Sequence, residues 1–212
     1  MDFKAAIFDF DGTLADSMWM WKKLAVSWAK KYGMVADDAF VNKIMYSTFE
    51  ESVEYFIDNY NIDLNKSLKS WTVKALFMYL FKVREVKGAK KYLERIKKSG
   101  RKIAVASNCS PGLCRIMLRK MGIYKYIDAD VYSFRTGKGK NEPDIYLKAA
   151  ELLAVKPEEC MVYEDSPVAI EGVRRANMKL TGIYVPGSSY NEFLKEKADM
   201  FIRNYEGLNF SS

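Results

Sequence analysis

Histidine is absent from this chain of 212 residues, and cysteine occurs only three times, as Cys109, Cys114 and Cys160. An odd number of cysteines without paired short spacings is not the framework of a disulfide-rich fold. Because there is no imidazole and no CxxC spacing, a structural zinc site is disfavoured. Reduced thiols are typical of a cytoplasmic protein, and we expect that location.

Long apolar runs are also lacking. The chain begins MDFKAAIFDFDGTL, where Asp9 and Asp11 interrupt the apolar run, so we expect no signal peptide. No stretch reaches the ~18 consecutive apolar residues of a membrane helix. Neither GxxxxGK[ST] nor a GxGxxG after a strand is present, which disfavours a P-loop and a dinucleotide-binding fold.

The charge is moderately positive, with a formal net charge of +7. Hydrophobic residues make up 49% and charged residues 29%, as in ordinary globular proteins. The lysines are scattered along helical stretches and accompany no nucleic-acid-binding motif, so we expect a solvated basic surface and no nucleic-acid partner. Such a surface can steer anionic substrates toward the protein.

The order of patterns along the chain predicts a two-part organisation. Residues 5–8 form a short apolar run typical of a buried strand, and residues 17–84 are mostly helical. From residue 85 onward, strands and helices alternate. Expected strands are 102–106, 129–134, 160–163, 180–185 and a short 200–202, and expected helices are 89–98, 113–121, 145–153 and 168–176. This alternation predicts an α/β fold with a doubly wound parallel sheet.

The helical stretch interrupts the alternation directly after the first strand. We therefore expect an α/β core made of residues 1–16 and 85–212, with residues 17–84 inserted as a helical cap. Within the insert, apolar spacing predicts a helix that ends before Gly33, followed by helices near 39–60 and 68–83.

Polar residues follow several of the expected strands, at the sheet edge where open parallel sheets bind ligands. These residues are Asp9, Asp11, Gly12, Thr13, Ser107, Asn108, Lys140, Glu164 and Asp165. Carboxylates are ligands that Mg2+ prefers, while lysine and hydroxyl groups bind phosphate oxygens. The pattern indicates a site for a divalent cation and a phosphoryl group.

The spacing of Asp9 and Asp11 has a chemical use. Side chains two residues apart in an extended chain point the same way, so one carboxylate can attack phosphorus while the other handles a proton. Gly12 then permits a tight turn in which backbone N–H groups approach the phosphate closely.

Four motifs resemble the signatures of the haloacid dehalogenase-like superfamily. DFDGTLADS resembles the first, DxDGT; Ser107 after KIAVA resembles the second; Lys140 in KNEPDIYLKAAE resembles the third; and Glu164-Asp165-Ser166 resembles the fourth. Their order, and the insertion after the first, resemble the subgroup of β-phosphoglucomutases and phosphoglycolate-type phosphatases. The resemblance spans residues 4 to about 185.

The resemblance implies a role for each matched residue. Asp9 is the nucleophile and a Mg2+ ligand, while Asp11 is the acid–base group and lends its backbone carbonyl to the metal. Asp165 and Glu164 complete the metal site. Ser107 and Lys140 hold the phosphoryl group. Beyond the resemblance, we expect Asn108 and the turn of Gly12 and Thr13 to contribute to binding it. Carbon–halogen hydrolases of the superfamily lack an acid at the place of Asp11, so its presence favours phosphate chemistry.

Other interpretations of these residues stay open. Lys138 competes with Lys140, and Ser107 or the Glu164-Asp165 pair can instead cap a following helix. The tryptophans of the insert, Trp19, Trp21, Trp28 and Trp71, are expected to form its core, with Trp21 the best candidate for a substrate contact.

We expect a phosphatase that acts on a small phosphorylated metabolite; the substrate and the choice between monomer and dimer stay open. A sugar-phosphate phosphomutase is the alternative. The chain lacks the histidine that such mutases use near the hinge, Trp21 stands roughly in its place, and no arginine precedes Arg84, although Lys43 or Lys74 can substitute. A receiver-like phosphorylation switch is a third hypothesis, which the insertion of 70-odd residues disfavours.

Overall fold

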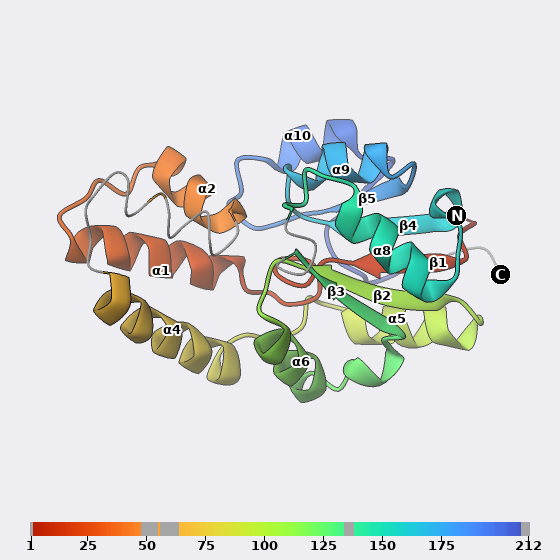
Figure 1. Cartoon of the computed structure of the whole chain (residues 1–212), viewed down its shortest axis with the longest axis horizontal. Coiled ribbons are helices and arrows are strands. Elements are labelled where there is room, and N and C mark those ends of the chain that lie inside the picture. Colours follow the sequence, from red (N-terminus) through yellow and green to blue (C-terminus); the bar gives the residue numbers. More distant parts are fainter. Residues whose placement is uncertain (1, 48–54, 56–63, 134–137, 209–212) are drawn as a thin grey trace. The chain divides into compact units, whose positions relative to one another are not determined.

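The computed structural model describes residues 2–47, 55, 64–133 and 138–208, with the backbone alone for residues 64–72 (Figure 1). The chain divides into two compact units. One contains residues 1–16 and 84–212, and the other contains residues 17–83. Over the described residues, no helix combines the length and the apolarity that a membrane span requires.

The first unit is built on a six-stranded parallel sheet in the order β3-β2-β1-β4-β5-β6. Its strands are β1 (Ala5–Phe8), β2 (Lys102–Ser107), β3 (Ala129–Tyr132), β4 (Cys160–Glu164), β5 (Lys179–Ile183) and β6 (Met200–Ile202). The central strands β1 and β4 are fully buried, as expected for a parallel sheet covered on both faces. The predicted fold class is confirmed.

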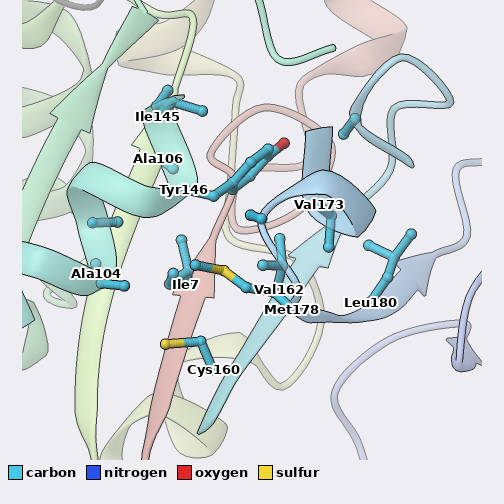
Figure 2. Close-up of a cluster of buried hydrophobic side chains, with 14 of the residues drawn as sticks. Ile7, Ala104, Ala106, Ile145, Tyr146, Cys160, Val162, Val173, Met178 and Leu180 are labelled. Atoms are coloured by element: carbon cyan, nitrogen blue, oxygen red, sulfur yellow. The ribbon is translucent and has the colours of Figure 1, made fainter. Parts of the chain in front are cut away.

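Helices cover both faces of this sheet. They are α5 (Ala89–Lys98), α6 (Pro111–Lys120), α8 (Asp144–Leu153), α9 (Ala169–Arg175) and α10 (Asn191–Lys197), with 3-10 turns η1 (Tyr124–Tyr126) and η2 (Pro157–Glu159). On one face, Ile7 and Val162 pack in a core with Tyr146 of α8 and Val173 of α9 (Figure 2).

The opposite face of the sheet carries an aromatic cluster. The ring of Phe8 stacks on that of Tyr163 at 4.4 Å between centroids, and Tyr92 of α5 stacks on Tyr205 at 5.3 Å. The hydroxyl groups of Tyr92 and Tyr163 are 2.5 Å apart and share a hydrogen bond. Neighbouring residues of β1 and β4 thus serve opposite faces, as strand geometry requires.

The second unit contains α1 (Met18–Lys31), α2 (Asp38–Tyr46) and α4 (Leu64–Phe81). Trp28, Phe40 and Ile44 belong to its buried core, and Asp37 caps α2 by accepting a hydrogen bond from the Phe40 amide at 2.8 Å. The helix predicted near 39–60 ends at Tyr46, because Ser47 is extended. Of its remainder, Tyr55 is helical, and residues 48–54 and 56–60 lie outside the described part.

The expectation that the insert's tryptophans form its core holds for some of them. Trp28 is buried, whereas Trp19 is 40% exposed. Trp21, the expected substrate contact, donates a hydrogen bond from Nε1 to the hydroxyl of Tyr79 at 3.1 Å, so it joins α1 to α4. The side chain of Trp71 lies outside the described residues.

Gly172 of α9 sits where a side chain has no room. A Cβ placed there would clash with the backbone carbonyl of Lys140 and lie 2.8 Å from the carbonyl oxygen of Glu142. The absent side chain therefore lets α9 pack directly on the backbone that carries Lys140. By contrast, a Cβ at Gly112, in helix α6, would meet nothing within 4 Å.

We predict that Gly172→Ala lowers the free energy of unfolding by about 1–3 kcal/mol, because overpacking must push α9 from the Lys140 backbone. Gly112→Ala is the matched control and should be neutral or stabilising by up to about 1 kcal/mol, since alanine favours helix. Urea unfolding measures both. Equal effects of the two substitutions would contradict the packing argument.

Candidate active site

The carboxyl ends of β1, β2 and β4 meet at one edge of the sheet. Phe8 pairs with Val105 of β2 and with Tyr163 of β4, and the Asp9 amide donates to the Tyr163 carbonyl at 2.9 Å. Asp9 therefore lies beside Glu164, the last residue of β4.

A buried lysine connects these two acids. The Nζ atom of Lys140 contacts Oδ1 of Asp9 and lies 2.5 Å from Oε1 of Glu164. Its side chain is 5% exposed, whereas Lys138 is 52% exposed and pairs with Asp144 at the surface. Of the two lysines that the sequence left in competition, the structure brings Lys140 to the acids.

Glu164 has further partners that hold its carboxylate. The hydroxyl of Tyr146 donates to Oε1 at 3.1 Å, and the Ser166 amide donates to Oε2 at 3.3 Å. Glu164 is completely buried, so these bonds and Lys140 replace the water that it has lost. Helix α9 begins with Val168 at the N-cap and has no side-chain cap, so the Glu164-Asp165 pair does not cap it.

Asp165 lies against the turn that follows β1. The Oγ1 atom of Thr13 donates to Oδ1 of Asp165 at 3.4 Å, and any Cβ on Gly12 would collide with the Asp165 carboxylate. The Oδ2 atom of Asp165 is buried, and the described residues offer it no hydrogen-bond partner. A buried acceptor oxygen in this environment fits contact with a ligand or a cation.

The turn itself is closed by its own backbone. Gly12 has a φ of +80°, and its amide donates to the Ala15 carbonyl at 2.8 Å, while the amides of Leu14 and Ala15 donate to the Phe10 carbonyl. The Gly12 amide is thus engaged within the turn. What Gly12 supplies is its left-handed conformation and the space beside Asp165.

Ser107 and Asn108 end the neighbouring strand β2. Ser107 is 1% exposed, and its Oγ accepts a hydrogen bond from the Cys109 amide at 3.0 Å. Helix α6 begins at Pro111 with Ser110 at the N-cap, so Ser107 is not a helix cap. The Oδ1 atom of Asn108 is buried without a hydrogen-bond partner among the described residues.

Burial, reinforced by neighbouring negative charge, raises the pKa values of Asp9 and Asp165. Desolvation, opposed by Lys140 and reinforced by Glu164, raises the pKa of Asp9 to about 8. The pKa of Asp165 is held well above its ordinary value by burial and then by the charges of Asp9 and Glu164. The charge of Asp11 adds, as the smallest cause, to both increases. Burial opposes the charge of Lys140, but the neighbouring carboxylates raise its pKa overall.

This charge distribution fits a divalent cation. Asp9, Glu164 and Asp165 each place a carboxylate oxygen within 4.8 Å of the others, and all three residues are buried. A single lysine cannot balance three carboxylates. Carboxylate oxygens are the donors that hard cations such as Mg2+ prefer, so the residues present fit a metal ion.

Three supporting residues were not anticipated from the sequence. Tyr146 orients Glu164, Gly172 admits the Lys140 backbone, and Tyr205 donates from its hydroxyl to the Thr13 carbonyl at 3.2 Å. A glycine inside a helical pattern is a weak signal of close packing. Gly172 is such a glycine, so its role was the one of the three that the sequence could have indicated. Tyr146 and Tyr205 read as ordinary apolar positions until the chain is folded.

Known proteins resemble this chain over most of its length. Residues 6–183 match the haloacid dehalogenase-like hydrolase family. A phosphorylated carbohydrates phosphatase from Thermotoga maritima is 28% identical, over 83% of this chain and 82% of its own. A β-phosphoglucomutase from Bacillus subtilis is also 28% identical, over 85% and 83%.

A solved structure extends the likeness to the fold. The β-phosphoglucomutase of Clostridium difficile superposes with a TM-score of 0.79 at 20% identity, covering 98% of this chain and 94% of its own. The expected subgroup and the expected class of enzyme, a phosphoric monoester hydrolase, agree with these relatives. With a match that covers both the first and the fourth motif, the chain belongs to the haloacid dehalogenase-like hydrolase family.

Proposed function

We propose that this enzyme is a Mg2+-dependent phosphatase that hydrolyses a small phosphorylated metabolite through an aspartyl-phosphate on Asp9. The observation that carries the proposal is the buried cluster in which Lys140 contacts both Asp9 and Glu164 beside Asp165. The phosphatase from Thermotoga maritima, named for phosphorylated carbohydrates, supports this class of substrate. Residues 17–83 would serve as the substrate-selecting cap, and we propose a cytoplasmic location.

Asp9, Glu164 and Asp165 would hold Mg2+, together with the backbone carbonyl of Asp11. Bound Mg2+ would offset the excess negative charge and weaken the repulsion between the Asp9 carboxylate and a phosphate dianion. Thr13 would keep the Asp165 carboxylate in place through the hydrogen bond from Oγ1.

The chain's own groups would perform the two displacements. A carboxylate oxygen of Asp9 forms a bond to phosphorus while the bond from phosphorus to the substrate oxygen breaks, and Asp11 gives its proton to that oxygen. Asp11 then takes a proton from water, which attacks phosphorus and releases orthophosphate from Asp9. Phosphoryl oxygens would be held by Lys140, Ser107 and Asn108. Because the Gly12 amide donates to the Ala15 carbonyl, the Thr13 amide would be the group of this turn that approaches the phosphate, and Gly12 would contribute the conformation that allows it.

A phosphomutase is the second candidate, since a β-phosphoglucomutase has the same 28% identity to the chain as the phosphatase. Trp21 and Lys74, which the sequence offered as a substrate contact and as a substitute for a mutase residue, both contact residues of their own unit. Trp21 donates to the hydroxyl of Tyr79, and the Nζ atom of Lys74 donates to Oγ of Ser27 at 3.4 Å. With no histidine in the chain, hydrolysis is the better supported reaction.

We predict that the enzyme releases orthophosphate from phosphorylated metabolites with Mg2+, and that Asp9→Asn lowers the rate at least about 10³-fold, because the amide is no nucleophile. A substrate panel read by phosphate release measures this. Asp2→Asn, at an exposed position, is the control and should match the wild type.

The same assay separates the two candidates. Isomerised sugar phosphate that forms only after priming with a bisphosphate, with little orthophosphate, would replace the phosphatase by the mutase. Near-wild-type release by Asp9→Asn would remove Asp9 from the proposed role under either reaction.

We predict that Lys140→Met lowers the rate at least about 10²-fold and destabilises the fold by up to about 5 kcal/mol, because buried carboxylates lose their ammonium partner. Lys138→Met removes a surface pair of little value and should stay close to wild type. Phosphate release and urea unfolding test both variants. Equal losses at positions 138 and 140 would contradict the assignment of Lys140.

We predict that stabilisation by Mg2+ increases from pH 6 to pH 8.5. The folded-state pKa of Asp9, about 8, exceeds the unfolded value, so the metal-free fold loses stability as pH rises from about 4 to 8. Mg2+ needs the ionised carboxylates and releases their protons. At a Mg2+ concentration a hundredfold above Kd, binding adds about 2.7 kcal/mol to the free energy of unfolding. For a chain of this size, that raises Tm by about 5–10 °C.

Thermal unfolding with and without Mg2+, and calorimetry in buffers of different ionisation enthalpy, measure the increment and the proton release. In Asp9→Asn the increment should depend less on pH. An increment that is equal at pH 6 and pH 8.5, without proton release, would contradict the prediction.

A further inference from the structure

Tyr205 lies beyond the residues that match the family, which end at position 183. It follows β6 in the C-terminal segment and is 2% exposed. Its ring belongs to the aromatic cluster behind the sheet, stacked on Tyr92 and 6.1 Å from the ring of Phe8. Nothing in the reaction described above uses this residue.

The hydroxyl of Tyr205 reaches the turn after β1. It donates to the backbone carbonyl of Thr13 at 3.2 Å, and Thr13 is fully buried. Within the same residue, Oγ1 donates to Asp165. Thr13 is therefore held on two sides, with its carbonyl bound by Tyr205 and its hydroxyl bound to a proposed metal ligand.

The C-terminal segment around Tyr205 is anchored to the rest of its unit. The Tyr205 amide donates to the Lys87 carbonyl at 3.0 Å, and Arg95 donates to the Leu208 carbonyl at 2.7 Å. A Cβ on Gly88 would lie 2.9 Å from the Tyr205 carbonyl carbon, so glycine is needed for this close approach. These contacts make the segment a fixed support for the hydroxyl.

We propose that Tyr205 is a positioning residue for the metal site, which acts through Thr13 on the carboxylate of Asp165. The inference rests on the proposed Mg2+ site. Without the hydroxyl, the buried Thr13 carbonyl loses its donor and the turn shifts to find another. The bond from Thr13 to Asp165 is already long, at 3.4 Å, and a small shift of the turn breaks it.

The test compares Tyr205→Phe with Tyr92→Phe. Both substitutions remove one buried hydroxyl from the same aromatic cluster and keep the ring, but the Tyr92 hydroxyl bonds to Tyr163 rather than to the turn. Calorimetric titration with MgCl2 alone reports metal binding without catalysis. We expect about 10-fold weaker Mg2+ binding in Tyr205→Phe and less than about twofold change in Tyr92→Phe.

A kinetic measurement supplies a second readout. The Mg2+ concentration for half-maximal kcat should rise in Tyr205→Phe by the same factor, while KM for the substrate at saturating Mg2+ stays at the wild-type value. Equal Mg2+ affinities in the two tyrosine variants would overturn the inference, since a merely structural role affects both alike.

Thr13→Val provides an independent variant that removes the middle of the connection. It should weaken Mg2+ binding as Tyr205→Phe does. The double variant should bind Mg2+ with the same affinity as whichever single variant binds it less tightly, because both changes break the same connection. Additive losses of Mg2+ affinity would overturn the inference. Wild-type affinity in Thr13→Val would overturn it too, even if Tyr205→Phe fails to fold.

A wild-type enzyme that neither binds Mg2+ nor releases phosphate would overturn the proposed function as well. If the wild-type enzyme binds Mg2+ and the variants bind it equally well, this inference alone is overturned.

Discussion

Three carboxylates and one ammonium group lie together at the sheet edge with almost no access to water. Taking such charges out of water is expensive, and Lys140 can compensate only part of it through Asp9 and Glu164. Hydrogen bonds from Tyr146 and Ser166 satisfy Glu164 further. Burial first, and then the charges of neighbouring carboxylates, raise the pKa values of Asp9 and Asp165. Three carboxylates beside one ammonium group therefore fit a bound cation.

The backbone makes this concentration of charge possible. Parallel strands bring the ends of β1, β2 and β4 to one edge. Two glycines then allow neighbouring segments to approach closely at that edge. Gly12 gives Asp165 space beside the turn, and Gly172 gives the Lys140 backbone space beside α9. Residues far apart along the chain therefore meet because two side chains are missing where packing is tightest.

Much of the fold could be predicted because apolar patterns directly report burial. The run AAIF coincides with β1, and helix α5 has the predicted bounds. Helix α10 was missed because its seven residues bury only Leu194, too little for a detectable period. Helix α2 ends at Tyr46, within the helix predicted near 39–60, because Ser47 adopts an extended backbone, which the apolar pattern does not reveal.

The sequence by itself determined the parallel sheet, the helical insert and the types of residue at the strand ends, since strand direction sends those residues to one edge. Only the tertiary structure decided between Lys138 and Lys140, because both are polar residues in one loop and burial against Asp9 separates them. It also decided that Tyr146 and Tyr205 touch the site. A tyrosine reads as apolar along the chain, and the partner of its hydroxyl is set only by packing.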